Sequence, residues 1–445
     1  MRLTPSRLLF ATVVASSLIF FFLVSHLFFK ERGYDILPDR PAAPAARPSP
    51  PQVSFGETCS PFLSGAMDDV TIIIKLGAPE VAYKLPAYLK RLTPCKPNLL
   101  LFSDRKDSIG DLEIVDALAN LRPEYKHNNP DFDIYEEIQR SNETPEKGIE
   151  GWRLDKYKFL PMMELTANQT PDAAWFVFIE LDTYVNWDNL YRFLSRFDSR
   201  KAHYFGSPVW PKKKKQPAYA HGGSGFVLSH GALRKMVARG RMFAENHISP
   251  GTHLFGKDVS KECCGDEVLA RVLKECGVKL RGYSPMFNEE RPPLIAFGHD
   301  HWCEAILGLH HMDEHDFEAL HHWETTRPNP KKPLTYEDLF AYMEISMSDQ
   351  KEDWTNLSED IVFKRSDAAS ASFDACFKAC LKDSRCVQCE HFENTCRHSH
   401  VIRLGHRQLR DGNKRWISGW VMDRVQSWKA SQPPCQGAHI VHPIP

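Results

Sequence analysis

The sequence has almost no net charge and lacks the two commonest nucleotide-binding motifs. Lys and Arg total 56 against 57 Asp and Glu, a formal net charge of −1, so no electrostatic field favours a nucleic-acid or acidic partner. No GK[ST] P-loop occurs, and the glycine-rich segment at 222–225 lacks the GxGxxG spacing of a dinucleotide-binding turn. A phosphate-binding role therefore has to rest on other residues.

Long hydrophobic runs are represented by one stretch near the N-terminus. Residues 8–29 carry no charged side chain apart from a titratable histidine, and as a helix they would span roughly 33 Å. Basic residues flank the run on both sides, which gives a modest positive-inside bias. We expect a transmembrane signal anchor that follows a cytoplasmic tail of residues 1–7. A cleaved signal peptide is the alternative, but its apolar region is shorter.

Proline-rich and cysteine-rich segments suggest the domain boundaries. Residues 30–64 contain six prolines between Pro38 and Pro51, which predicts an extended stem. We expect the remaining boundaries at 65–345 for an α/β domain, 346–370 for a linker, 371–436 for a cysteine-rich module and 437–445 for a tail. A module of some sixty residues buries little surface, so disulfides are expected to stabilise it.

The twelve cysteines form two groups of six, Cys59, Cys95, Cys263, Cys264, Cys276 and Cys303, then Cys376, Cys380, Cys386, Cys389, Cys396 and Cys435. Even numbers in a chain expected in the lumen favour disulfides. A zinc site at Cys386-x2-Cys389 is the alternative, but it lacks a second matched pair. Sequons at Asn142, Asn168 and Asn356 predict glycosylation in the same compartment.

Apolar strands alternate with helical segments through the larger domain. We expect strands at 69–77, 98–107 and 175–179, and helices at 79–92 with an interruption near Pro86, at 152–168 with a break or register change near Pro161, and at 188–197. The alternation predicts an α/β domain with a largely parallel sheet. Ligands of such sheets bind at the carboxyl ends of the strands.

Two acidic residues directly follow the strand at 175–179. Glu180 and Asp182 are separated by one residue, and side chains two apart in a strand point to the same face. Their like charges repel unless a cation lies nearby, and carboxylate oxygens suit Mg²⁺ or Mn²⁺. The pattern therefore predicts a divalent cation site, with a pair of exposed turn carboxylates as the alternative.

Three further segments carry residues suited to a functional site. Gly222, Gly223 and Ser224 lie in a loop whose glycines allow close approach to a ligand, although a plain turn would also fit. Asp266 and Glu267 begin a helical segment, where acids suit the helix dipole or could act as a general base. Seven histidines follow, and at most two need be metal ligands: His299, His301, His310, His311, His315, His321 and His322.

Taken in order, these segments resemble glycosyltransferase family 31, the group of Fringe and the core 1 β3-galactosyltransferase, and most closely its fungal members. The matching stretches are IIIKLG, LLLFSD, WRLDKYKFLPMM, WFVFIELDTYVNWDNL, YFGSPV, HGGSGFVLS, GDEVLARVLKECGV and LGLHHM, within roughly residues 65–345. The segment ACFKACLKDSRCVQCEHFENTCRHSHVIRLG resembles a PAN/apple module. The resemblance implies a GT-A fold, Mn²⁺ or Mg²⁺ as cofactor, and a UDP-sugar donor.

The resemblance also implies roles for the acids and histidines. Asp182 of ELD would ligate the metal, and Glu180 would lie near the nucleotide ribose and the metal shell. His310 of LGLHHM would be the further metal ligand, with His311 as the alternative. Asp104 of FSD would lie near the uridine.

The remaining implied roles concern the glycine loop and the base. Gly222, Gly223 and Ser224 would line the donor and acceptor site, with Ser224 where alanine is frequent in the family. Asp266 would be the catalytic base. The family usually has a Glu-Asp pair at this point, so the choice between Asp266 and Glu267 stays open, and we favour Asp266.

The expected protein is a Golgi, single-pass type II membrane protein with a luminal catalytic domain. It would transfer a hexose, galactose or N-acetylglucosamine, with inversion to a glycan or glycoprotein hydroxyl, and a β1,3 linkage is expected. Its partners would be the donor, the acceptor, the membrane through its N-terminal helix and, as a candidate, a second copy of the chain, with no nucleic acid. The alternative is an inactive GT-A-fold protein that binds carbohydrate or mediates adhesion.

Overall fold

A computed structural model describes residues 35–36, 59–140, 151–212, 216–244, 259–298, 301–410, 412 and 414–444. The chain divides into two units, Met1–Asp35 and Ile36–Pro445. The two sheets described below lie in the second unit. Within the described ranges no helix has both the length and the apolar character needed to cross a membrane. The predicted anchor at 8–29 falls outside those ranges.

An eight-stranded mixed sheet forms the centre of the larger domain, in the order β12-β8-β11-β6-β2-β3-β5-β4. Its strands are β2 (Val70–Lys75), β3 (Asn98–Ser103), β4 (Asp107–Ile109), β5 (Leu112–Asp116), β6 (Trp175–Ile179), β8 (Tyr204–Gly206), β11 (Phe226–Ser229) and β12 (Leu280–Gly282). β2 pairs in parallel with β3 and β6, whereas β11 runs antiparallel to β6 and β8. The predicted α/β class is confirmed, with a sheet that is parallel at its centre and mixed towards its edges.

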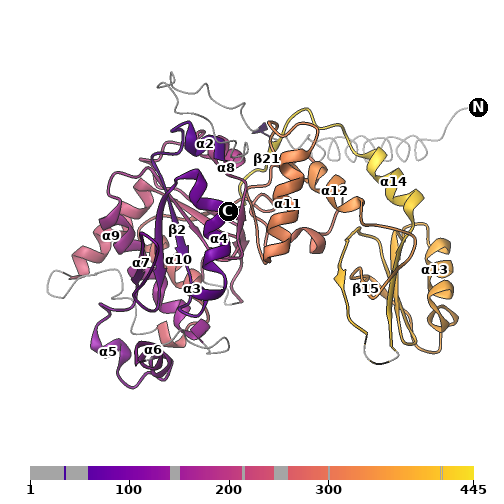
Figure 1. The fold of residues 1–445 in the computed structure, drawn as a ribbon, viewed down its shortest axis with the longest axis horizontal. Coiled ribbons are helices and arrows are strands. Elements are labelled where there is room, and N and C mark those ends of the chain that lie inside the picture. Colours follow the sequence, from indigo (N-terminus) through magenta and orange to yellow (C-terminus); the bar gives the residue numbers. More distant parts are fainter. Residues whose placement is uncertain are drawn as a thin grey trace, which may run out of the picture. The chain divides into compact units, whose positions relative to one another are not determined.

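Helices cover both faces of this sheet (Figure 1). Ile72 and Ile74 of β2 pack in one cluster with α4 (Leu85–Leu92) and α8 (Trp187–Leu194). Ile73, which points the other way, packs in a second cluster with helices α6 (Asp131–Arg140), α7 (Asp155–Gln169), α9 (His230–Ala244) and α10 (Gly265–Glu275). Burial on both faces explains why the central strands read as continuous apolar runs.

The two prolines predicted to interrupt helices behave differently. The segment at 79–92 forms α3 (Glu80–Tyr83) and α4, and Pro86 lies in the first turn of α4, where proline is tolerated. Pro161 lies inside α7, which continues past it, so the predicted break is wrong. Met162 and Met163 beside the proline are buried in the core, and this packing offsets the hydrogen bond that the proline removes.

Further elements belong to the larger domain. They are α2 (Ser60–Leu63), α5 (Pro123–Lys126), α11 (Glu314–Thr326), α12 (Tyr336–Glu344) and the strand pair β9 (Pro208–Val209) with β10 (Tyr219–Ala220). A disulfide joins Cys59 to Cys95, and Phe62 is buried beside them. Packing of the larger domain therefore begins within residues 30–64, the predicted stem.

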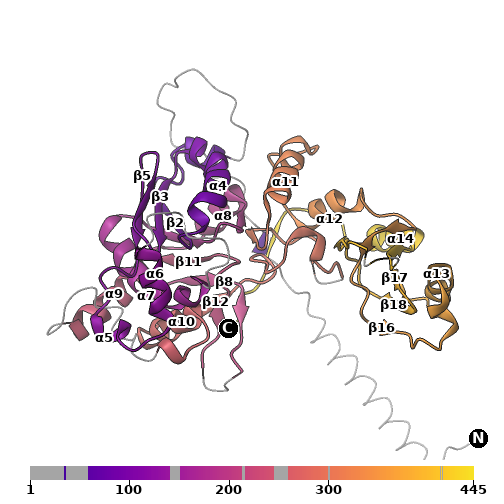
Figure 2. The same cartoon turned by 60° about the horizontal axis from the view of Figure 1, so that its bottom comes forward.

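A second, smaller antiparallel sheet lies in the C-terminal part of the chain (Figure 2). Its strands, in spatial order, are β14 (Lys351–Glu352), β20 (Trp416–Trp420), β17 (Gln388–Phe392), β18 (Thr395–Ser399) and β16 (Ile361–Val362). α13 (Phe373–Lys382) packs against β17, and the separate strands β15 (Trp354–Thr355) and β19 (His406–Arg407) pair with each other. Because β14 and β16 come from residues 346–370, the small sheet extends into the predicted linker.

Two disulfides stabilise this smaller sheet, as expected for a cysteine-rich module. One joins Cys376 of α13 to Cys396 of β18, and the other joins Cys380 to Cys386. Cys389 is a buried free thiol. The zinc alternative at Cys386-x2-Cys389 is therefore wrong, because the first of its two sulfurs is already bonded.

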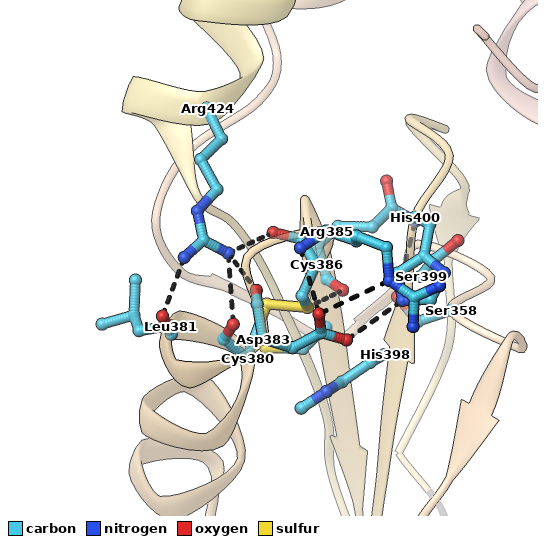
Figure 3. Close-up of a disulfide and its surroundings, with 12 residues drawn as sticks. Ser358, Cys380, Leu381, Asp383, Arg385, Cys386, His398, Ser399, His400 and Arg424 are labelled. Atoms are coloured by element: carbon cyan, nitrogen blue, oxygen red, sulfur yellow. Dashed lines mark hydrogen bonds and ion pairs between the residues drawn. A yellow bond between two sulfur atoms is a disulfide. The ribbon is translucent and has the colours of Figure 1, made fainter. Parts of the chain in front are cut away.

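Arg424 of α14 (Met422–Ser431) organises the loop that the second disulfide closes (Figure 3). Its guanidinium donates hydrogen bonds to the carbonyl oxygens of Cys380, Leu381, Asp383 and Cys386, at 3.2, 2.7, 2.6 and 2.6 Å. Carbonyls at a helix C-terminus lack partners within the helix. Arg424 therefore caps the C-terminus of α13 and also holds the backbone of the loop between Cys380 and Cys386 in place.

A further disulfide crosses between the two predicted cysteine groups. Cys303 of the larger domain bonds to Cys435, so the six C-terminal cysteines are not a self-contained set. Beside it, Trp428 of α14 packs against Trp302 and Phe340 at ring-centroid distances of 5.4 and 5.1 Å. The C-terminal segment is therefore joined to the larger domain both covalently and by aromatic packing.

The three sequons differ in whether the structure leaves their asparagine accessible to a glycan. Asn168 is exposed near the end of α7, in agreement with a glycan acceptor. Asn356 is fully buried, and its Nδ2 donates to the carbonyls of Cys389 and Gly419. Its predicted glycosylation is therefore wrong, because the amide nitrogen is used inside the fold. Asn142 lies outside the described residues.

Candidate active site

A short two-stranded ribbon brings the predicted metal ligands together. β7 (Tyr184–Val185) follows Asp182 and pairs antiparallel with β13 (Gly308–Leu309), with Leu309 opposite Tyr184. Residues after Leu309 therefore lie beside residues before Tyr184. The backbone N–H of Met312 donates to the carbonyl of Asp182 at 3.0 Å, which fixes this arrangement.

The ribbon places both candidate histidines next to Asp182. His310 Nε2 lies 3.5 Å from Asp182 Oδ1, and His311 Nδ1 lies 3.9 Å from Oδ2. His310 is buried and His311 is more than half exposed. One carboxylate oxygen and two imidazole nitrogens, all within 4.8 Å of one another, form a group that could hold a divalent cation. Burial works to raise the pKa of Asp182, but the hydrogen bond and charge of His310 outweigh it and hold the pKa below its usual value.

The immediate surroundings of His310 fit a metal ligand. Its Nδ1 is buried without a hydrogen-bond partner among the described residues. A Cβ atom added to Gly223 would lie only 2.1 Å from His310 Nε2, so glycine is needed at 223 for the ring to occupy this position. The residues present therefore fit a divalent cation of the Mn²⁺ or Mg²⁺ kind, with His310 as the buried ligand and His311 beside it at the surface.

The glycine loop lies at the same edge of the sheet because β11 runs antiparallel to β6 and begins where β6 ends. Thr183 joins the two segments: its Oγ1 donates to the carbonyl of Gly223 at 2.7 Å and accepts from the N–H of Glu180 at 3.0 Å. Ser224 is buried, and its N–H and hydroxyl both contact His221 Nδ1, at 3.2 and 2.9 Å. Ser224 therefore supports the shape of the loop.

Asp266, at the start of α10, faces this loop. Its Oδ2 accepts a hydrogen bond from the N–H of Gly222 at 3.1 Å, and its Oδ1 accepts from the N–H of Glu267 at 2.8 Å. A Cβ atom on Gly222 would lie 3.5 Å from Asp266 Oδ2 and 3.6 Å from Glu180 Oε1, so Gly222 lies between the two carboxylates. Burial raises the pKa of Asp266, which makes it a stronger base than an exposed aspartate.

Glu267 points to different neighbours. Its Oε2 lies 3.3 Å from the sulfur of Cys263, which is bonded to Cys264. The side chain is buried against this cysteine pair, whereas Asp266 contacts the glycine loop. Asp266 accepts a hydrogen bond from the glycine loop, and this contact supports it as the candidate base.

A lysine for which the sequence indicated no role forms an ion pair with Glu180. Lys75, the last residue of β2, is buried, and its Nζ lies 3.1 Å from Glu180 Oε1 and 2.7 Å from Asp155 Oδ2. Burial alone would lower the pKa of Lys75, but Asp155 and Glu180 raise it above its ordinary value. The available signal was a lysine at the end of the apolar run IIIK. Part of the positive charge that the ELD acids require therefore comes from the protein itself.

The same chain of charges continues to Asp104. Lys158 Nζ lies 2.9 Å from Asp155 Oδ1 and 2.8 Å from Asp104 Oδ2. Asp104 is fully buried and also accepts from the N–H of Ala78 at 2.7 Å. The structure therefore places Asp104 at the carboxyl end of β3 as predicted, but its carboxylate is used to hold the loop after β2.

Fold and site together define a class: an α/β protein with a candidate divalent cation site beside a glycine loop, against which the buried carboxylate of Asp266 packs. Residues 151–290 match the family model described as Fringe-like. The matched segment contains the ELD acids, the glycine loop and the start of α10, and it ends before His310. The match supports a glycosyltransferase of the Fringe-like family 31, with a GT-A-like domain.

Proposed function

We propose that the chain is an inverting, metal-dependent glycosyltransferase that transfers a hexose from a UDP-sugar to a hydroxyl of a glycan or glycoprotein. The observation that carries this proposal is the arrangement of Asp182 and His310 on one side of the glycine loop and Asp266 on the other. Transfer of a sugar from a nucleoside diphosphate needs charge neutralisation at the leaving group and a base at the attacking hydroxyl. The two sides of the loop supply these two functions.

On the donor side, Asp182 and His310 would hold Mn²⁺ or Mg²⁺, with His311 as a further ligand at the surface. The bound ion supplies Lewis-acid stabilisation of the diphosphate leaving group. Glu180 is held by an ion pair between Lys75 and one of its oxygens, and it would contact the ribose of the donor. Gly222 lets the donor approach the loop backbone closely, and Gly223 leaves room for His310.

On the acceptor side, Asp266 would take the proton from the attacking hydroxyl. The backbone N–H of Gly222 orients its carboxylate, and its raised pKa suits proton acceptance. Inversion requires attack on the face of the sugar opposite the leaving group, and related logic separates the two carboxylates of inverting glycosidases. Glu267, held at the cysteine pair, would support the start of α10.

The finer assignments follow from the resemblance in the sequence. We propose galactose or N-acetylglucosamine as the transferred sugar, a β1,3 linkage, a fungal-type enzyme, and a Golgi location as a type II protein anchored by residues 8–29. The smaller domain would be a PAN/apple-like module that binds carbohydrate or protein and positions the acceptor. Deletion of residues 371–445 with no change in any glycan would contradict that last role.

A screen of UDP-sugars tests the activity. Residues 55–445 are expressed as a secreted fragment, and UDP release is measured with Mn²⁺, with a chelator, and in an Asp182→Ala control. One preferred donor, with release lost in the chelator and in the control, is the expected result. Binding of UDP-sugars without turnover in any acceptor mixture would favour the inactive carbohydrate-binding alternative.

A further inference from the structure

A cavity of about 380 Å³ is lined in part by β7, but by none of the candidate metal ligands, glycine-loop residues or base candidates. Its walls come mainly from α4, α11 and the segment from β7 to the start of α8. Ligand pockets in proteins commonly have volumes of about 300–1,000 Å³. The cavity therefore has the size of a small-molecule site, at a place that the proposed transfer reaction does not use.

Aromatic rings form one part of its wall. Tyr88 of α4 and Phe317 of α11 meet edge to face at a centroid distance of 5.6 Å, and Tyr184 of β7 lies 6.5 Å from Phe317. All three are largely buried, so their positions are fixed by packing. Fixed aromatic rings offer apolar surface to a ligand that has an apolar face.

The buried carboxyl group of Glu324 provides a polar part of the cavity wall. Tyr184 Oη donates to Glu324 Oε2 at 2.6 Å, and Asn186 Nδ2 donates to Oε1. Each oxygen can accept one further hydrogen bond. Burial raises the pKa of Glu324 to about 7, with Arg327 and Asp188 as the other charged neighbours. Near neutral pH the group therefore offers both a donor and an acceptor to a hydroxyl.

Acidic and basic side chains both line the cavity. They are Asp188, Glu314 and Glu318 beside Glu324, and Lys90, Arg91, Arg327 and Lys332. Arg91 donates to the carbonyls of Ala87 and Glu314 and lies over the ring of Phe317, and Arg327 pairs with Asp338 at 2.8 Å. Because these two guanidinium groups already have protein partners, an uncharged ligand suits the cavity better than an anion.

We propose that this cavity binds a neutral saccharide unit through its aromatic wall and Glu324, without a divalent cation or a nucleotide. A sugar ring combines an apolar face with hydroxyls that both donate and accept hydrogen bonds, which matches the two parts of the wall. The site is separate from the proposed transfer reaction and does not depend on it. A test must therefore distinguish the cavity from the active site and from the C-terminal module.

Saturation-transfer NMR on the full chain, in EDTA and without nucleotide, supplies that test. The probes are the methyl β-glycosides of galactose, glucose and N-acetylglucosamine. Ala87→Trp fills the cavity from α4, and Thr325→Trp fills it from α11, so that the proposal stays testable if one variant misfolds. Tyr83→Trp adds the same ring at an exposed position outside the cavity, and Asp182→Ala disables the active site.

The expected result is binding of at least one glycoside to the unaltered chain, to Tyr83→Trp and to Asp182→Ala with equal affinity. Binding should weaken at least tenfold in a folded cavity-filling variant. Equal binding in the filled variants would overturn the proposal, because the sugar would then occupy another part of the chain. Loss of binding in Asp182→Ala, or no binding of any of the three glycosides, would also overturn it.

Discussion

Gly223 and His310 occupy positions that only a glycine at 223 allows. A Cβ atom at 223 would lie 2.1 Å from His310 Nε2 and 2.3 Å from Cε1 of the same ring. Both atoms belong to a buried imidazole that has little room to move. The glycine loop and the proposed metal site therefore form one structural unit, although about ninety residues separate them in the sequence.

Gly223→Ala is therefore expected to displace His310 and weaken Mn²⁺ binding by at least about tenfold. Isothermal titration of Mn²⁺ measures the effect. Gly151→Ala is the matched control, because a Cβ atom there meets nothing within 4 Å. Equal Mn²⁺ affinity in the two variants would contradict the assignment of His310 as a ligand.

Asp266→Asn is expected to lower kcat/KM by about 10²–10⁴-fold, the usual range for loss of a general base. Because burial raises the pKa of Asp266, kcat/KM should rise with pH through an apparent pKa that is higher than that of a free aspartate. This acid limb should disappear in Asp266→Asn. Glu267→Gln is the control, and it should keep the limb, since Glu267 contacts Cys263 instead. A larger loss in Glu267→Gln would reverse the assignment of the base.

Asp155→Asn is expected to destabilise the fold by about 1–2 kcal/mol, because Lys75 and Lys158 stay buried and lose a partner that is itself partly exposed. Burial works to raise the pKa of Asp155, but the two lysines lower it well below its usual value. The stabilisation is therefore present above the unfolded pKa of about 4 and is lost as the pH falls below it.

Melting temperatures between pH 7 and pH 3 check this prediction. Asp155→Asn should melt lower than the unaltered chain at pH 7, and the difference should shrink towards pH 3. Glu113→Gln removes an exposed ion pair with Lys106 and should cost less than about 1 kcal/mol. A difference that stays constant with pH would show that the charge of Asp155 does not stabilise the fold.

Replacing Cys303 and Cys435 together by serine is expected to lower stability by about 4–5 kcal/mol, the loop-closure value for a disulfide spanning more than a hundred residues. A lower melting temperature and faster proteolysis near residue 435 are the readouts. Cys276→Ser, which removes a free thiol, serves as the control. Unchanged melting of the double variant would mean that aromatic packing around Trp428 alone secures the C-terminal segment.

The sequence predicted the α/β class and the residues that lie together at the candidate active site. It did not predict which side chains form ion pairs and hydrogen bonds with those residues. The ELD acids were recognisable because they end an apolar strand, and the strand ends of an α/β sheet meet at one edge. The pairing of Lys75 with Glu180 depends on which strands are neighbours, and no local pattern gives that. Asn356 shows the same limit, because a sequon contains no information about burial.

Titration of UDP into the protein, with and without Mn²⁺, measures whether the donor nucleotide binds through the metal. We expect UDP to bind tightly only with Mn²⁺, and we expect its affinity to fall at least about tenfold in Asp182→Ala and in His310→Ala. Asp266→Asn should bind UDP as well as the unaltered chain does. UDP binding that is independent of Mn²⁺, or unchanged in Asp182→Ala, would contradict a metal-dependent UDP-sugar site at the end of β6.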